Sequence, residues 1–191
     1  PHSHASAVLF FVPSSSHACC IALPSRVSCV REPPLGSSLD DMGDDTLDRD
    51  ARIKLSIGTK QQGHDDGTFD FPSGLAFDHH RGLLLVVDSS NSRVQIFSCD
   101  DGGGGAFSFV SKFGEEGGRP SQLQYPYGIA IDHDHDRILI TDCGNDRVQS
   151  WSLSDQSFLS CVGQYGTGDL EFSNPQGIAI DKHHHRIIIV D

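Results

Sequence analysis

Three stretches of the chain repeat one pattern: FPSGLAFDHHRGLLLVVD (71–88), YPYGIAIDHDHDRILITD (125–142) and NPQGIAIDKHHHRIIIVD (174–191). Each has Pro-x-Gly, then apolar-Ala-apolar-Asp, then a polar turn, then an apolar run that ends in a second Asp. The two aspartates lie ten residues apart in all three stretches. Repetition of this kind at a period of about 20 to 50 residues indicates a stacked repeat architecture.

The first two copies also continue alike. They run on as SSNSRVQIFS (89–98) and CGNDRVQSWS (143–152), and each then reaches an apolar segment that closes on glycine. These segments are FVSKFG (109–114) and FLSCVG (158–163). The prolines of successive copies are 54 and then 49 residues apart, and the extra residues fall around the glycine run DDGGGGA. Repeated units tolerate an insertion that is confined to one loop.

Each full copy predicts four strands. In the second copy these are 128–132, 138–142, 147–153 and 158–162. The first is short with a small alanine in its middle, and the second has an Ile-Leu-Ile run that suits burial on both faces. The pattern predicts an all-β fold, a β-propeller of four-stranded antiparallel blades in an incomplete ring. The expected blades are one at about 72–114, two at about 126–163, and a truncated third at 175–191.

The motif Pro-x-Gly-Ile-Ala-Ile-Asp followed by Ile-x-Ile-x-Asp-x-x-Asn-x-Arg-Val-Gln resembles the NHL repeat. The resemblance covers about residues 53–191 and implies a propeller, commonly one of six blades. IKLSIG (53–58) stands before its Pro-x-Gly in the place of FVSKFG, so we expect it to be the outer strand of a preceding blade. The chain starts without Met and stops at a motif that continues elsewhere, which predicts a piece of a longer propeller.

Residues 1–52 have a different composition, with Ser/Pro-rich tracts and the acidic run DDMGDDTLDRD. This composition predicts a disordered, low-complexity leader. Its one early apolar stretch, AVLFFV (7–12), is too short to span a bilayer, and the tail of a signal peptide is the alternative interpretation. We therefore predict no membrane span.

The formal net charge of −12 makes nucleic acid an unlikely partner, because a phosphate backbone is bound through basic patches. The six cysteines include no C-x-x-C pair, so zinc-finger spacing is absent. We interpret them as ordinary thiols, which favours a reducing compartment such as the cytoplasm. The oligomeric state stays open.

The most conspicuous polar set lies where the second strand turns into the third, and we name it the turn lock. The carboxylate is expected to accept amides of the following turn and to pair with the Arg, while Asn would take a left-handed conformation. A set repeated in every blade suits a structural turn better than a single active site, so we expect no catalytic residue. The turn lock comprises Asp88, Asn91 and Arg93 in one copy and Asp142, Asn145 and Arg147 in the next.

Histidines recur in the turn after the first strand, among acids that could share a metal ion. The candidates are His133, His135, His183 and His185, with His79 and His80 in the first copy. Because these turns are expected to be exposed and on separate blades, we expect no specific metal site and no cofactor.

Aromatic residues flank the loops that lead into each first strand and form a possible binding surface, although packing against the blades is the alternative. These aromatics are Tyr125, Tyr127, Tyr165 and Phe172, with Phe69 and Phe71 at the first copy.

The pattern favours a macromolecular, mainly protein, interaction scaffold. Phosphate-loop, Gly-x-Ser-x-Gly and His-Glu-x-x-His motifs are absent from the sequence. The family resemblance implies one alternative, the C-terminal part of a TRIM/RING-type ubiquitin ligase or an RNA regulator. It also implies a second, a metal-dependent propeller lyase or hydrolase, although the first strands here carry apolar residues such as Ile129 and Ile131.

Overall fold

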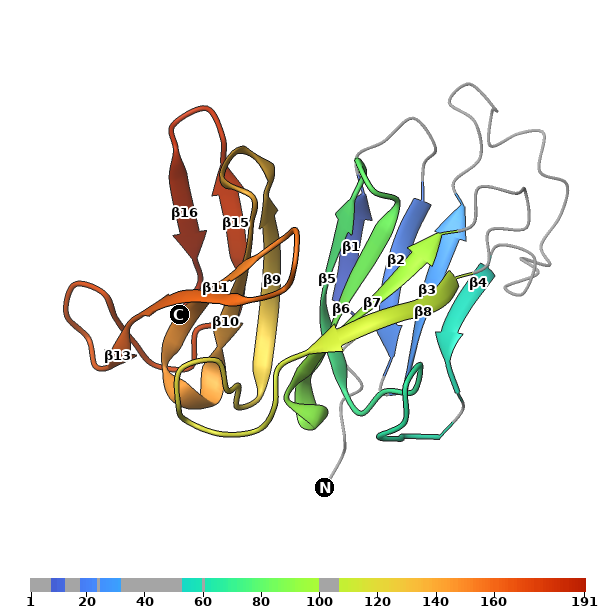
Figure 1. Ribbon diagram of the computed structural model, residues 1–191, viewed down its shortest axis with the longest axis horizontal. Helices are drawn as coiled ribbons and strands as arrows, with labels where there is room; N and C mark the ends of the chain where they lie inside the picture. Colours follow the sequence, from blue (N-terminus) through green and yellow to red (C-terminus); the bar gives the residue numbers. More distant parts are fainter. Residues whose placement is uncertain (1–7, 13–17, 24, 32–52, 60, 100–106) are drawn as a thin grey trace, which may run out of the picture.

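The computed structural model describes residues 8–12, 18–23, 25–31, 53–59, 61–99 and 107–191 (Figure 1). These residues form strands joined by turns and short 3-10 helices, and none of them forms a helix long and apolar enough to cross a membrane. The acidic run at 40–50 and the glycine loop at 100–106 lie outside the described residues. The all-β prediction is confirmed.

Two complete blades form the centre of the molecule, and in each the strands follow one another in antiparallel order. The first consists of β5 (Pro72–Asp78), β6 (Leu83–Asp88), β7 (Arg93–Cys99) and β8 (Phe107–Phe113). The second consists of β9 (Pro126–Asp132), β10 (Arg137–Asp142), β11 (Arg147–Ser152) and β12 (Phe158–Val162). These are the four-stranded antiparallel units that the repeat predicts.

The last repeat contributes an antiparallel hairpin of two strands, β15 (Ile178–Asp181) and β16 (Arg186–Ile189). The short parallel pair of β13 (Gln164–Tyr165) and β14 (Glu171–Phe172) connects it to the second blade. Three-residue 3-10 helices form tight turns elsewhere: η2 (Ser89–Asn91), η3 (His133–His135) and η4 (Cys143–Asn145).

A further four-stranded sheet precedes the repeats, and the expectation of a disordered leader is wrong for residues 8–12, 18–23 and 26–31, while residues 32–52 lie outside the described part of the chain. It contains β1 (Val8–Val12), β2 (Ala18–Leu23), β3 (Arg26–Arg31) and β4 (Ile53–Gly58), in that order. IKLSIG is the fourth strand of this sheet, as its likeness to FVSKFG indicates.

The N-terminal sheet covers one apolar face of the first complete blade. Successive side chains of β6 point to opposite faces of that blade. Leu84 and Val86 belong to one apolar cluster, and Leu85 and Val87 belong to another. Both faces of the blade therefore need an apolar cover. Val27 and Ile57 of the N-terminal sheet belong to the first cluster, and each is at most 7% exposed.

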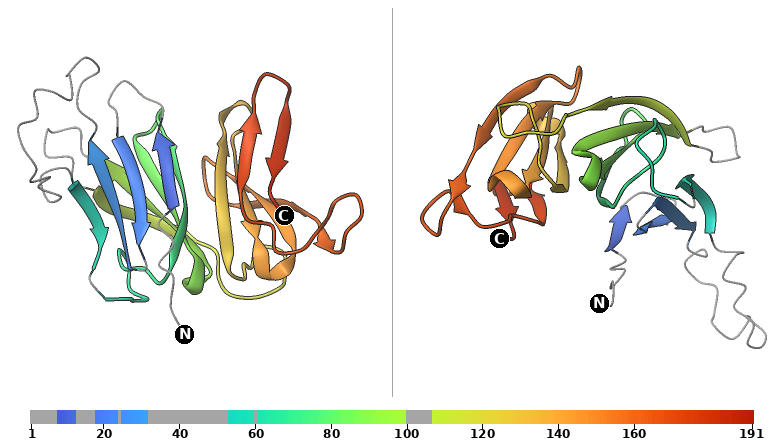
Figure 2. Two further views of the ribbon diagram at one scale, coloured as in Figure 1. Left: turned by 180° about the vertical axis from the view of Figure 1, so that it is seen from behind. Right: turned by 90° about the horizontal axis from the view of Figure 1, so that it is seen from below.

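The sheets stand side by side in an arc, with β5, β9 and β15 as neighbours along its inner side (Figure 2). The glycine of Pro-x-Gly permits this close approach. A Cβ on Gly74 would lie 2.4 Å from the carbonyl oxygen of Tyr127, and a Cβ on Gly128 would lie 2.2 Å from that of Gln176. Each repeat thus needs glycine where its inner strand meets the backbone of the next repeat.

The core between the two complete blades includes residues of their second and third strands. Leu85, Val87 and Ile96 contribute from one blade, and Ile138 and Ile140 from the other. All five are at most 2% exposed, and burial of such a side chain contributes about 1.5 to 3 kcal/mol.

An aromatic pair also crosses this core. The rings of Phe113 and Trp151 have centroids 4.8 Å apart. Aromatic pairs at such a separation stabilise by about 0.5 to 1.5 kcal/mol beyond their buried area.

Candidate functional site

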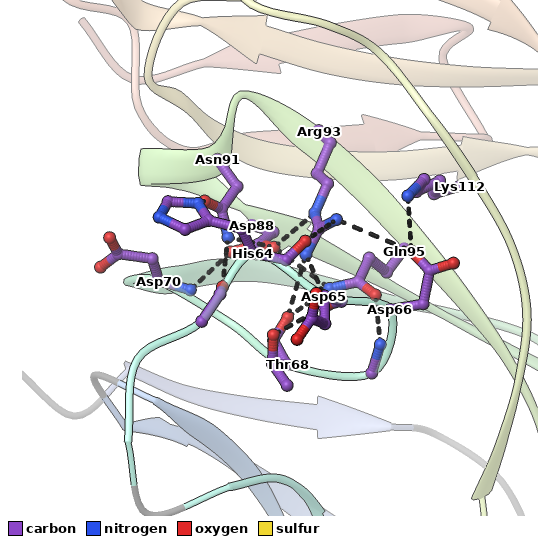
Figure 3. A network of polar contacts seen from close by, with 12 residues as sticks. His64, Asp65, Asp66, Thr68, Asp70, Asp88, Asn91, Arg93, Gln95 and Lys112 are labelled. Atoms are coloured by element: carbon purple, nitrogen blue, oxygen red, sulfur yellow. Dashed lines mark hydrogen bonds and ion pairs between the residues drawn. The ribbon is translucent and has the colours of Figure 1, made fainter.

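A buried carboxylate, Asp88 at the end of β6, is the centre of the first turn lock (Figure 3). Its Oδ2 accepts hydrogen bonds from Arg93 Nε at 2.7 Å, Asn91 Nδ2 at 2.9 Å and Gln95 Nε2 at 3.1 Å. Its Oδ1 accepts the backbone amide of Asp70 at 2.8 Å. The side chain of Asp88 is fully buried, and these bonds supply the pairing that a buried charge requires.

Arg93 extends the network into residues 61–71, which we name the lead-in loop of β5. Its Nη1 donates to the carbonyl oxygen of His64 at 2.8 Å. Its Nη2 donates to the carbonyl oxygens of Asp65 at 3.0 Å and Thr68 at 3.1 Å. The guanidinium therefore binds the protein's own backbone, and it fixes the conformation of this loop.

The second blade contains the same lock around Asp142. Its Oδ2 accepts Arg147 Nε at 2.8 Å and the side-chain amides of Asn145 and Gln149, both at 2.9 Å. Its Oδ1 accepts the backbone amide of Gln124 at 2.6 Å. Arg147 also donates to carbonyl oxygens of the lead-in loop of β9, residues 115–125, namely those of Gly118, Arg119 and Gln122.

Two details of the predicted lock were wrong. The left-handed residue is not the asparagine but the residue after it, since φ is 51° at both Ser92 and Asp146. That position ends a 3-10 turn, where a left-handed residue commonly follows the last helical one. The asparagines instead donate to the carboxylate and to a lead-in loop carbonyl, Gly63 for Asn91 and Gly117 for Asn145.

The second wrong detail concerns the amide bound by the carboxylate. Asp88 and Asp142 make no side-chain hydrogen bond that caps the following turn. Each binds an amide of the preceding lead-in loop, at Asp70 and Gln124. That amide is far away in the sequence, so the local pattern gave no sign of it.

Gln95 and Gln149 are fully buried members of the two locks that were not predicted. The Nε2 of Gln95 donates to the carbonyl oxygen of Thr68 at 2.7 Å, and its Oε1 accepts the amide of Gly67 at 2.9 Å. The available signal was the repeated Arg-Val-Gln, in which a polar residue occupies a position of a buried strand.

The lock holds the residue directly before an exposed aromatic side chain. Phe71 follows Asp70 and is 55% exposed, and Tyr125 follows Gln124 and is 57% exposed. Both have a left-handed backbone, with φ of 52° and 46°. This conformation is uncommon for a bulky residue, and each case lies at the same position before Pro-x-Gly.

The remaining aromatics divide between core and surface. Phe69 is 0% exposed and Phe172 is 8% exposed, so Phe172 is excluded from the predicted binding surface. They occupy equivalent positions three residues before the proline, and Phe172 lies where a Cβ on Gly163 would touch its ring. Tyr165 is 76% exposed, and Tyr127 is half-buried.

The histidines lie in the turns after the first strands, as their positions indicate. His135 Nδ1 is 2.9 Å from Asp132 Oδ2, while His183 and His185 are exposed. The expectation that histidines of separate blades lie apart is wrong for one pair. The rings of His80 and His133 have centroids 4.4 Å apart, because equivalent turns of neighbouring blades meet on the inner side of the arc.

Two groups near these sites have perturbed acidity. Burial opposes ionisation of Asp132, but hydrogen bonds from Arg137 and His135 outweigh it and hold the pKa of this carboxyl below its ordinary value. Burial, with the charge of Asp142, raises the pKa of the Cys143 thiol to about 12. Cys143 therefore stays protonated at neutral pH, and its Sγ donates to the carbonyl oxygen of Pro175 at 2.7 Å.

Comparison with known proteins agrees with this geometry. The family model described as NHL repeat matches residues 69–97, a range that contains the first turn lock. The E3 ubiquitin-protein ligase NHLRC1 of Rattus norvegicus is 38% identical over 79 residues, which are 41% of this chain and 18% of that protein. Protein brain tumor of Drosophila melanogaster is 38% identical over 77 residues, which are 40% of this chain and 7% of that protein.

The matched part is thus less than a fifth of either relative. Among solved structures, the β-propeller domain of Cps50 (Swd1) of Myceliophteria thermophila superposes with a TM-score of 0.54 at 11% identity. It covers 95% of this chain and 49% of that one, which shows the propeller fold. Residues 69–97 thus match the NHL repeat, and the chain as a whole has the fold of a β-propeller and resembles NHL-repeat proteins.

Proposed function

We propose that this chain is a protein-interaction scaffold whose binding surface is centred on the aromatic residues at the ends of the lead-in loops. The carrying observation is that Phe71 and Tyr125 occupy the same position in two successive blades, exposed and in a left-handed conformation. Tyr165, in the connection to the last hairpin, and the half-buried Tyr127 complete the proposed surface.

The backbone conformation of these two residues supports a role in binding. A residue held in a sparsely populated region costs on the order of 1 to 3 kcal/mol and persists only when its surroundings impose it. Here Asp88 and Asp142 fix the preceding amides, and the carbonyl oxygen of Phe71 accepts the amide of Ser89 at 3.2 Å. The locks thus fix the backbone next to each exposed ring.

Rigid aromatic side chains are suited to anchoring a protein partner. Aromatic residues are enriched at the centres of protein interfaces, and a fixed anchor loses little conformational freedom on binding. The net charge of −12 disfavours a phosphate backbone, so a protein is a better occupant than a nucleic acid.

A more specific role follows from one relative. The 38% identity to a protein named as an E3 ubiquitin-protein ligase supports a propeller that captures a partner for ubiquitin transfer. In that case a purified partner of the aromatic surface would be ubiquitinated by the complete protein that contains these repeats, and loss of the aromatic anchors would abolish the modification.

The scaffold is tested with the full chain as bait, compared with the double variant Phe71→Ser/Tyr125→Ser. Proteins retained by the wild type and lost by the double variant are purified, and their binding is measured by calorimetry with and without a chelator. We expect at least about tenfold weaker binding by the double variant, since two aromatic anchors are removed. Binding should persist in the chelator.

The matched control is Leu159→Ser, because Leu159 is similarly exposed, at 51%, but lies on the outer strand β12. It should bind like the wild type, and all three proteins should have similar melting temperatures. A double variant that retains every partner of the wild type would refute the proposed surface.

A further inference from the structure

Three potential metal ligands meet where the β5–β6 turn of one blade approaches the β9–β10 turn of the next. They are Asp78, His80 and His133, and their ligand atoms all lie within 4.8 Å of one another. Asp78 ends β5, and His133 opens the turn after β9. Asp78 and His133 are 55 residues apart along the chain, so the group spans two blades.

Asp78 is held firmly in this group. Its side chain is fully buried, and its Oδ1 accepts the backbone amides of His80 at 3.0 Å and Arg81 at 3.3 Å. The same Oδ1 lies 3.9 Å from His133 Nε2. Arg81 binds the other oxygen, Oδ2, at 3.1 Å, so the oxygen that faces the histidine is not the one paired with the guanidinium.

His133 is suited to accept a metal ion. Its side chain is 16% exposed. Its Nε2 lies 3.9 Å from Asp78 Oδ1, so the two ligand atoms face the same space. An imidazole nitrogen is a common ligand of zinc.

We propose that Asp78, His80 and His133 bind a divalent transition-metal ion, zinc foremost. Two imidazoles and one carboxylate form a ligand set that zinc accepts, with a water molecule in the fourth position of a tetrahedron. Small movements of the exposed His80 ring bring ligand atoms that lie within 4.8 Å to the separations that zinc coordination needs. The bound ion joins two blades beside the Arg81–Asp136 ion pair, which links the same turns at 3.5 Å.

The repeats supply an internal comparison. Gapless alignment places Asp132, Asp134 and Lys182 at the corresponding positions of the next pair of turns. There a lysine replaces His133 and an aspartate replaces His80. Among the described residues, the three-ligand group occurs at the first pair of turns and not at the second. The group is thus a feature of one pair of turns and not a requirement of the blade.

The site is tested by titrating ZnCl2 into the metal-free full chain in a calorimeter. We expect one ion per chain. His133→Lys and His80→Ala should each bind zinc at least about tenfold more weakly, because even the loss of a residue that only orients a metal ligand weakens binding by this factor. Co2+ in place of zinc should give the intense visible absorption of a tetrahedral site in the wild type, and this absorption should be lost in both variants.

His183→Ala is the matched control, because His183 occupies the position of His80 in the last hairpin and is exposed. It should bind zinc like the wild type. The exposed His80 gives a variant that should keep the metal-free melting temperature, so weakened binding in His80→Ala cannot be a folding defect. Equal weakening by His183→Ala, or unchanged affinity in His80→Ala and His133→Lys, would show adventitious binding by surface histidines and overturn the proposal.

Discussion

The two ends of the second strand carry polar clusters of different character. At its C-terminal end, the locks around Asp88 and Asp142 have the same donors at closely similar distances in both blades. Beside its N-terminal end, Asp132 and Asp181 each pair with a histidine three residues on and an arginine five residues on, whereas Asp78 pairs with Arg81, three residues on.

This difference separates two kinds of requirement. The lock carboxylates are fully buried and bind backbone of the lead-in loop, so every blade needs the same solution. The partners in the hairpin turns are largely exposed, with Arg81 at 42% and His135 at 58%, so each turn can vary without loss of the blade. Variation at an exposed, well-positioned site is where a specialised property such as metal binding can arise.

The largest expected effect is at the lock. Arg147→Ala leaves Asp142 buried without its ion-pair partner, which should lower the free energy of unfolding by about 3 to 5 kcal/mol. Urea denaturation measures the change. Arg186→Ala is the control, because Arg186 pairs with Asp181 at 2.9 Å but the two side chains are 63% and 21% exposed, so its loss should change the free energy of unfolding much less. Equal losses would mean that burial does not distinguish the two clusters.

A smaller effect is expected where neighbouring blades touch. Gly128→Ala places a Cβ 2.2 Å from the carbonyl oxygen of Gln176, so the strands must separate, at a cost of about 1 to 3 kcal/mol. Thermal denaturation compares it with Gly118→Ala, whose Cβ meets its nearest atom, Asn145 Oδ1, at 3.4 Å. Equal melting temperatures of the two variants would show that the inner strands do not pack closely at Gly128.

The smallest expected effect is the loss of stability at low pH. The pKa of Asp132 is lowered by Arg137 and His135 against the effect of burial, and that of Asp181 by Arg186 and His184. A lowered pKa in the folded state stabilises the protein above the ordinary value of 3.8, and this contribution is lost as the pH falls through the lowered value. The melting temperature should therefore decline below about pH 4.

The variant Asp132→Asn lacks one of these carboxylates. Its melting temperature should be lower than that of the wild type at pH 6, and the two should converge as the pH falls below the ordinary carboxyl value of 3.8. A constant difference across this range would show that the ionised carboxylate of Asp132 does not stabilise the fold.

Much of the fold could be predicted from local patterns. The strands β9 to β12 lie within two residues of the predicted ranges, because alternation and apolar runs report how each strand is buried. The pairing of Asp142 with Arg147 could be expected for the same reason, since both lie at the ends of adjacent strands that one tight turn joins. The first three strands of the N-terminal sheet could not, because their sequence lacks the repeated motif, and a composition rich in Ser and Pro hid these short strands.

The sequence by itself determined that this chain forms four-stranded propeller blades and which aspartate and arginine close each turn. These features depend on residues less than about one blade apart, so repetition and periodicity reveal them. Only the tertiary structure decided that the lock carboxylates hold the lead-in loops, that Gly74 and Gly128 permit the inner strands to touch, and that His80 and His133 meet. Those contacts depend on how segments far apart in the sequence pack against one another, and the spacing of residues along the chain does not show which segments meet.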